Sequence, residues 1–309
     1  MQNTSSSHPP QDVESRAFTV MTAAVVSLRP HQWVKNVLVF VPVAAAHLLA
    51  DQTLLRSALL AFVAFSLCAS AVYVLNDLHD IEADREHPHK RFRPIASGRL
   101  PVPIAIALIP TLLGAAGLIA AMLGLAVLGV LTAYFLLTVL YTVRLKAVVL
   151  LDAFALAAGY ALRVFAGSVA ENIPPSAQLF AFCIFLFFSL ALIKRYAELT
   201  LARSRDVTNP HARAYRLEDL DFVLVLGVSC GVMSVLVLAL YLGTAEAARI
   251  YSRAQLIWLT CILLLYWLSH LWLNAHRGRM TDDPLVFAVK NPVSLVLIVA
   301  MGMTAWLAV

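Results

Sequence analysis

The sequence predicts an all-α membrane protein that crosses the bilayer several times. Hydrophobic residues make up 61% of its 309 residues, charged residues make up 13%, and the mean hydropathy is +0.81. Soluble domains carry about 25% charged residues, so this composition excludes a water-soluble globule. The charges gather in short segments between long apolar runs, which is typical of a polytopic membrane protein.

Nine apolar runs have the length of a transmembrane helix or fall slightly short of it. They lie at residues 33–50, 54–76, 101–121, 123–142, 147–169, 176–196, 221–243, 254–273 and 290–309. The stretch 101–142 is about twice as long as one span needs, and Gly114, Gly117 and Gly124 mark plausible turns, so we divide it into two. We therefore expect nine transmembrane helices.

The positions of Lys and Arg predict the orientation. With the amino terminus in the cytoplasm, 19 of the 23 Lys and Arg residues fall in inner segments and three in outer loops. Because positive charge favours cytoplasmic loops, the charged segment 77–100 should face the cytoplasm. Residues 1–28 are polar and are expected to form a flexible cytoplasmic tail, so residues 29–309 form a single transmembrane domain.

The most informative feature is the acidic start of that charged segment. If the helix before it continues to about Glu86, then Asn76, Asp77, Asp80 and Asp84 share one helical face. Three carboxylates on one face repel one another unless a hard cation neutralises them, and oxygen ligands suit Mg²⁺. We predict that the three aspartates bind Mg²⁺ and that they act in catalysis together with Asn76.

A basic run follows the acidic residues. Lys90, Arg91 and Arg93 lie within a few residues of one another, with Arg99 close behind. Guanidinium groups bind phosphate oxygens bidentately, so we predict a Mg²⁺–diphosphate site in which the first three side chains contact substrate. The alternative is a solvated loop that simply obeys the positive-inside rule.

Two ionisable residues lie inside one apolar run. Asp152 and Arg163 are eleven residues apart, which is three helical turns, and Gly159 lies between them on the same stripe. Ionisable side chains are costly in lipid and therefore suggest function. We predict that Asp152 takes part in catalysis and that Arg163 binds an anionic group. The alternative is that each forms an internal ion pair with another helix.

Three further residues complete the predicted substrate site. Lys35 lies in the first apolar run beside Trp33, and Lys194 and Glu198 lie at the end of the sixth run. All three are expected near the cytoplasmic surface. For Lys35 the alternative is a lysine that extends its amine to the membrane interface, and for Lys194 and Glu198 it is a surface ion pair four residues apart.

The residues of the charged segment resemble a known signature. Asn76-Asp77-x-x-Asp80-x-x-x-Asp84 followed by Arg93-Pro94 is similar to the aspartate-rich motif of UbiA-type intramembrane prenyltransferases. The opening Leu28-Arg29-Pro30, the Asp152–Arg163 stripe and Lys194-Arg195-Tyr196 resemble the decaprenyl-phosphate phosphoribosyltransferase branch of that family. The resemblance covers nearly the whole chain.

The resemblance implies a UbiA-like bundle whose cavity opens to the cytoplasm. It also implies an integral-membrane transferase that moves 5-phosphoribose from phosphoribosyl diphosphate (PRPP) to a polyprenyl phosphate of the decaprenyl type. Mg²⁺ would be the cofactor, and the setting would be the bacterial inner membrane, where the product feeds lipid-linked arabinofuranose and cell-envelope glycan synthesis. We expect no nucleic-acid partner. Gly227, Gly231 and Ser234 could line helix contacts within one chain or in a homo-oligomer.

One departure from the family pattern favours that branch. UbiA prenyltransferases normally carry a second DxxxD-type motif between the sixth and seventh helices, and Asp206, Asp219 and Asp221 do not have that spacing. Two rival functions remain. One is a prenyltransferase that moves a prenyl group from prenyl diphosphate to an aromatic acceptor. The other is a transporter of a phosphorylated solute, in which Asp152 and Arg163 would line the pathway.

Overall fold

Helices account for the regular secondary structure of the described residues, which are 11–174, 176–204, 215–280 and 283–309 of this computed structural model. The α-helices are α1 (Gln11–Ser27), α2 (Val41–Ala45), α3 (Gln52–His79), α4 (Ile81–Glu86), α5 (Val102–Leu123), α6 (Leu125–Val143), α7 (Leu151–Ala170), α8 (Ala177–Ser204), α9 (Leu220–Leu242), α10 (Ala245–Ile250), α11 (Ala254–His276), α12 (Pro284–Lys290) and α13 (Pro292–Ala308). The 3₁₀ helices are η1 (Pro30–Phe40), η2 (Lys90–Phe92), η3 (Leu145–Ala147) and η4 (Leu217–Asp219).

The all-α, multi-pass prediction is confirmed, whereas the number of spans is not. Within the described ranges, seven helices are long and apolar enough to cross a membrane: α3, α5, α6, α7, α8, α9 and α11. The pair α12 and α13 makes an eighth if it counts as one span, although it bends by 90° at Asn291. Proline restricts the residue before it and cannot donate a backbone hydrogen bond, which explains the break ahead of Pro292.

The first expected span, residues 33–50, is not one continuous α-helix. It consists of η1 and the five-residue α2, and proline lies in the first turn of each. The segment expected to be a flexible tail is also largely helical, because α1 covers Gln11–Ser27. The domain boundary at residue 28 stays a prediction. By contrast, the division of 101–142 is confirmed: α5 ends at Leu123, and Gly124, at φ 128°, turns the chain into α6.

The helix that carries the acidic motif does not continue unbroken to Glu86, as we had expected. It is interrupted at Asp80, between α3 and α4. The interruption is one residue wide, and backbone hydrogen bonds run across it from Asp80 to Asn76 and from Asp84 to Asp80. The chain therefore changes direction slightly at Asp80 while Asp77 and Asp84 stay on one side.

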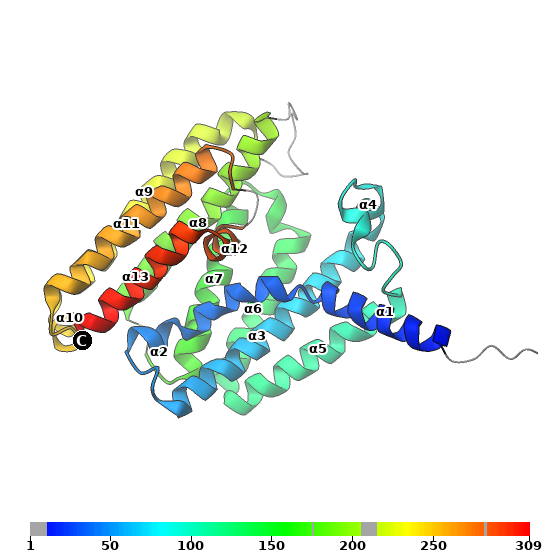
Figure 1. Cartoon of the computed structure of the whole chain (residues 1–309), viewed down its shortest axis with the longest axis horizontal. Helices are drawn as coiled ribbons and strands as arrows, with labels where there is room; N and C mark the ends of the chain where they lie inside the picture. Colours follow the sequence, from blue (N-terminus) through cyan, green and yellow to red (C-terminus); the bar gives the residue numbers. More distant parts are fainter. Residues whose placement is uncertain (1–10, 175, 205–214, 281–282) are drawn as a thin grey trace, which may run out of the picture.

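Helix α7 is the central element of the bundle (Figure 1). Tyr160 and Val164 belong to the core cluster shared with α8, α9 and α11, whereas Ala166 and Ala170 belong to the cluster shared with α3, α5 and α6. In α3 and α7, 61% and 56% of the spanning window is buried, against 22% in α5. Hence α3 and α7 are interior helices, and α5 presents most of its surface outward.

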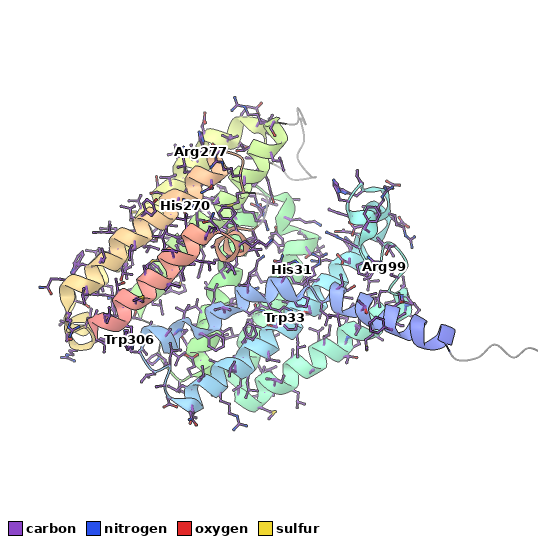
Figure 2. All side chains as sticks on the ribbon, in the orientation of Figure 1. His31, Trp33, Arg99, His270, Arg277 and Trp306 are labelled. Atoms are coloured by element: carbon purple, nitrogen blue, oxygen red, sulfur yellow. The ribbon has the colours of Figure 1, made fainter. Side chains whose placement is uncertain are left out.

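The two ends of the bundle differ in character. Figure 1 shows α4 projecting at the upper edge, whereas α10 and the carboxyl terminus lie together at the lower left. Arg277 lies toward the upper edge and Trp306 toward the lower left in Figure 2. The charged segment thus projects from the end opposite to the carboxyl terminus.

A close approach between η1 and α7 gives a test of the packing. A Cβ atom added at Gly167 would overlap the backbone carbonyl of Val39, and backbone cannot move aside cheaply. We expect Gly167→Ala to lower the free energy of unfolding by about 1–3 kcal/mol. Thermal unfolding in detergent measures the loss.

The matched control is Gly117→Ala, because no atom lies within 4 Å of a Cβ placed at that helical position. Alanine favours helix by about 0.5–1 kcal/mol over glycine, so this variant should be as stable as the parent or slightly more stable. Equal midpoints for both variants would contradict the packing of η1 on α7.

Candidate functional site

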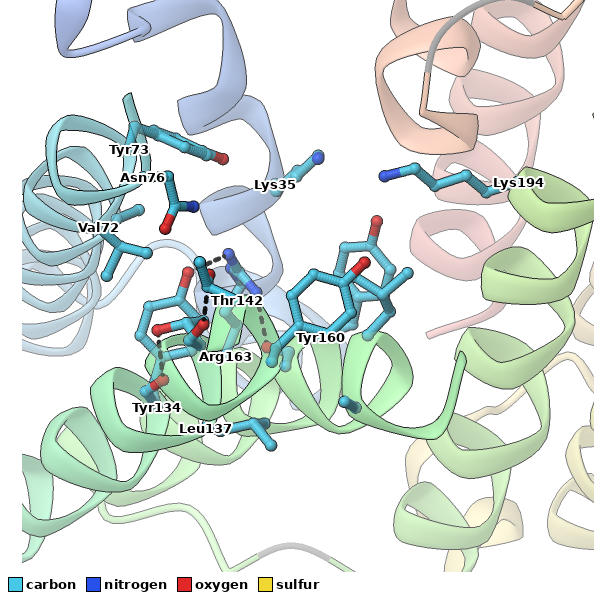
Figure 3. A pocket seen from close by; sticks show the side chains of 16 residues that line it. Lys35, Val72, Tyr73, Asn76, Tyr134, Leu137, Thr142, Tyr160, Arg163 and Lys194 are labelled. Atoms are coloured by element: carbon cyan, nitrogen blue, oxygen red, sulfur yellow. Dashed lines mark hydrogen bonds between the residues drawn. The ribbon is translucent and has the colours of Figure 1, made fainter. Parts of the chain in front are cut away.

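A polar cavity of about 180 Å³ lies between η1, α3, α6, α7 and α8. Figure 3 shows it from close by. Its polar lining residues are Lys35, Tyr73, Asn76, Tyr134, Thr138, Tyr141, Thr142, Tyr160, Arg163 and Lys194, and its apolar ones are Ala69, Val72, Leu137, Ala155, Leu156 and Gly159. Four residues predicted from widely separated parts of the sequence therefore meet here: Lys35, Asn76, Arg163 and Lys194.

Arg163 is held rigidly in the cavity wall by neutral partners. Its Nε donates to Asn36 Oδ1 at 2.7 Å, Nη1 to the carbonyl of Gly159 at 2.6 Å, and Nη2 to the hydroxyl of Tyr134 at 2.7 Å. Its guanidinium carbon also lies 4.6 Å from the centre of the Tyr134 ring. Within the described part of the chain, no carboxylate lies within 4.0 Å of it. The buried charge of Arg163 is therefore not cancelled by an ion pair.

Asp152, which we predicted to take part in catalysis, is not among the residues that line the cavity. It is fully buried, its Oδ2 lies 2.5 Å from Nε of Arg195, and Oδ1 accepts a hydrogen bond from Tyr215 at 2.8 Å. It thus forms the ion pair with another helix that we gave as the alternative, and its part in catalysis stays a prediction. A carboxylate in an apolar bundle needs a counter-charge, and Arg195 on α8 supplies it.

Glu198, which we predicted to contact substrate, does not line the cavity. It forms an ion pair with Arg195, at 2.6 Å between Nη1 and Oε2. Arg195 also donates to the hydroxyl of Tyr141 at 2.9 Å, and Tyr141 lines the cavity. Arg195 and Tyr141 thus connect Asp152 and Glu198 to the cavity wall.

Lys35 and Lys194 share a partner that the sequence analysis missed. Their ammonium groups lie 3.0 and 3.6 Å from Oδ2 of Asp283, and the hydroxyl of Tyr160 donates to both carboxylate oxygens at 2.9 and 3.0 Å. Burial alone would raise the pKa of Asp283, but the two ammonium groups outweigh it and hold the pKa below its ordinary value. The sequence Asp283-Pro284 signals only a helix start, which Asp283 indeed caps.

The acidic motif converges on an arginine. Nη1 of Arg93 lies 3.1 Å from Asp77 and 2.6 Å from Asp84, and Arg29 lies 2.5 Å from Asp77. Both carboxylates are nearly inaccessible. Asp80, at the helix break, is less buried. The structure thus brings together Asp77, Asp84 and Arg93 from the predicted set.

The donors in this region fit a hard divalent cation by chemistry. Asp77 and Asp84 are close enough to share one guanidinium nitrogen, and the buried Oδ1 of Asn76, which precedes Asp77 in the sequence, has no hydrogen-bond partner. Oxygen donors of this kind suit Mg²⁺. Across the described ranges, however, no three acidic, imidazole or thiol side chains are gathered as a metal site, and Arg93 pairs with the two aspartates.

The remaining basic residues of the predicted site lie outside the cavity lining. Lys90 and Arg91 are on the turn η2, where Arg91 is exposed and its guanidinium packs 4.9 Å from the ring centre of Phe92. The backbone N–H groups of His89 and Lys90 donate to Nδ1 of His87, which shapes this turn. Their predicted contact with substrate stays a prediction.

The fold and cavity define a multi-pass membrane protein with a polar site enclosed among its helices. The chain belongs to the UbiA prenyltransferase family, which its sequence matches over residues 39–308. The nodulation protein NoeC of Azorhizobium caulinodans is 37% identical over 276 residues, covering 89% of each chain. The decaprenyl-phosphate phosphoribosyltransferase of Mycobacterium tuberculosis is 37% identical over 233 residues, covering 72% of this chain and 76% of that one.

A solved structure has the same fold. It is a UbiA homolog from Archaeoglobus fulgidus bound to GPP and Mg²⁺, with a TM-score of 0.68 and 15% sequence identity, covering 92% of this chain and 99% of that one. The predicted family and fold are therefore confirmed, and the relatives identify the protein as a transferase.

The buried pair of Asp152 and Arg195 predicts a structural effect. Asp152→Ala would remove the fully buried one of the two carboxylates that pair with Arg195, and the partly exposed Glu198 would remain as its counter-charge. We expect the free energy of unfolding to fall by about 3 kcal/mol, the lower end of the range for a broken buried ion pair. Thermal unfolding in detergent measures the effect.

Tyr141→Phe is the control, because it removes only one neutral partner of Arg195. It should cost about 1 kcal/mol. An Asp152→Ala protein as stable as the parent would show that the ion pair does not hold α7 to α8.

Proposed function

We propose that this protein transfers 5-phosphoribose from PRPP to a polyprenyl phosphate of the decaprenyl type and releases diphosphate. The observation that carries the proposal is the charge of the cavity: Lys35, Lys194 and Arg163 line it, and Asp283 is the one carboxylate paired with any of the three among the described residues. This excess of positive charge suits substrates with several phosphates. The relatives named decaprenyl-phosphate phosphoribosyltransferase add support.

The metal proposal rests on the acidic motif. Asp77 and Asp84, with Asn76 and Asp80 beside them, would hold Mg²⁺, and a similarly folded UbiA homolog was solved with GPP and Mg²⁺. When bound, the metal would supply positive charge for the departing diphosphate. Arg93 and Arg29 would then be free to contact phosphate oxygens, and Lys90 and Arg91 would assist from the neighbouring turn.

The reaction itself needs little acid–base chemistry. The bond between ribose C1 and the diphosphate oxygen breaks, the ribosyl centre becomes oxocarbenium-like, and an oxygen of the ionised lipid phosphate forms the new bond to C1 from the opposite face. Inversion at C1 follows. Because the acceptor is already an anion, no general base is required. Asn76 would bind a ribose hydroxyl, and Lys35, Lys194 and Arg163 would orient phosphates.

The predicted roles of Asp152 and Glu198 change with their position. Through Arg195 they would orient Tyr141 at the cavity wall and would not touch substrate. We further propose that the protein lies in the bacterial inner membrane with this cavity open to the cytoplasm. The distribution of Lys and Arg supports that orientation. Its product would serve lipid-linked arabinofuranose synthesis for cell-envelope glycans.

The test is transfer of label from ribose-labelled PRPP into an organic-extractable lipid by the purified protein, with decaprenyl phosphate and with or without Mg²⁺. Label in the lipid phase that depends on Mg²⁺ is the expected result. If no label is transferred from PRPP, and a labelled prenyl diphosphate is consumed with an aromatic acceptor instead, the prenyltransferase alternative is correct.

The acidic motif predicts a large loss of activity in this assay. Asp77→Asn and Asp84→Asn each keep the size of the side chain but remove a carboxylate. We expect each to lower the initial transfer rate by about 10²-fold or more, because charge stabilisation of the leaving group is lost.

Glu82→Gln is the matched control, since Glu82 is an exposed carboxylate on α4, the helix that also carries Asp84. Its rate should equal that of the parent. The unfolding midpoint of every variant is measured alongside. If the folded Asp77→Asn and Asp84→Asn proteins keep full activity, these two aspartates do not take part in the mechanism.

A further inference from the structure

Three side chains from three separate parts of the chain surround one buried carboxylate. Asp283, just before α12, is contacted by Lys35 from η1, Lys194 from α8 and Tyr160 from α7. The Asp283 side chain is 6% exposed, whereas those of Lys35 and Lys194 are 13% and 26% exposed. Both lysines and Tyr160 line the cavity, and Asp283 does not. The carboxylate therefore lies behind the groups that a ligand would meet.

The charges around the cavity explain why a carboxylate is needed there. Two ammonium groups that face one small cavity repel each other, and Arg163 adds a third positive charge to the same wall. Oδ2 of Asp283 forms ion pairs with both ammonium groups, at 3.0 Å from Lys35 and 3.6 Å from Lys194, so this one oxygen holds the two lysines near each other. A single negative charge leaves the group of three cations positive, which favours an anionic ligand.

The lysines offer the largest number of unused donors. Arg163 donates three of its five N–H groups to protein acceptors, which leaves two. Each lysine ammonium has three N–H donors, and Asp283 is the only carboxylate within 4.0 Å of either ammonium among the described residues. In Figure 3, Asn76 and Lys194 lie on opposite sides of the cavity with Lys35 between them. Lys194 thus lies across the cavity from Asn76, and Lys35 lies between the two.

We propose that Lys35 and Lys194 form a binding site for a phosphate monoester, and that Asp283 and Tyr160 are the positioning residues that hold the two lysines in place. This deepens the proposed function and rests on it for the identity of the ligand. Two substrates carry such a group: the polyprenyl phosphate acceptor and the 5-phosphate end of PRPP. The site is separate from the one at Asp77 and Asp84, where diphosphate would bind.

The decisive variant is Asp283→Asn. Asparagine caps a helix as well as aspartate does, so the hydrogen bond to the backbone N–H of Leu285 is retained, whereas the negative charge and the second acceptor oxygen, which faces the lysines, are removed. We expect about tenfold weaker binding of one monoester probe and about tenfold higher KM for the matching substrate, with kcat changed less. Asp283→Glu restores the charge and should recover part of the affinity.

Two probes distinguish the source of the phosphate. We would measure the binding of two probes to the purified protein: decaprenyl phosphate in detergent micelles, and ribose 5-phosphate. Neither binding measurement depends on the phosphoribosyl-transfer activity. Weaker decaprenyl phosphate binding assigns the site to the acceptor. Weaker ribose 5-phosphate binding assigns it to the donor.

Lys35→Met and Lys194→Met keep the proposal testable if Asp283→Asn does not fold. Each should weaken the same probe at least tenfold, whereas Lys146→Met, on the turn η3 and outside the cavity lining, should not. If the folded lysine variants bind both probes as tightly as the parent protein does, the proposed phosphate site is wrong. This conclusion holds even if the parent protein transfers phosphoribose. If the parent transfers no phosphoribose but the lysine variants lose binding, the site stands and the proposed function fails.

Discussion

The structure depends on the need to neutralise or solvate every charge inside an apolar helical bundle. Asp152 meets this need with Arg195, Asp283 with Lys35 and Lys194, and Asp77 with Arg29 and Arg93. Each set joins residues that are distant in the sequence, so each ties helices together as it neutralises charge. Arg163 differs from these residues, because its hydrogen-bond partners are neutral. It leaves positive charge at the cavity wall.

Helix α7 connects the packing of the bundle to this site. Its two ends belong to different core clusters, and between them Tyr160 and Arg163 face the cavity. Gly159 and Gly167 on this helix have different uses. The first offers its carbonyl to Arg163, and the second allows η1 to approach closely enough to place Lys35. The packing that positions α7 therefore also positions the cationic side chains that line the cavity.

Sequence reasoning identified most of the spans and much of the site. Long apolar runs are a local property, so α3 and α5 to α9 lie close to where we expected them, and Gly124 marked a true turn. Our predictions for the first and last apolar runs were less accurate, since apolar composition does not reveal the 3₁₀ geometry of η1 or the bend at Asn291. Arg163 was recognised because ionisable residues inside apolar runs are costly, and Asn76 because it shares a predicted helical face with the three aspartates.

The sequence by itself determined that this is an all-helical membrane protein with an acidic motif, a basic loop and isolated intramembrane charges, because composition and spacing are written along the chain. Only the tertiary structure decided which charges face each other. Asp152 pairs with Arg195 and does not line the cavity. Asp283 pairs with both lysines, although its local sequence indicates only a helix cap. Pairing across a bundle depends on how helices pack in three dimensions, and no local pattern encodes it.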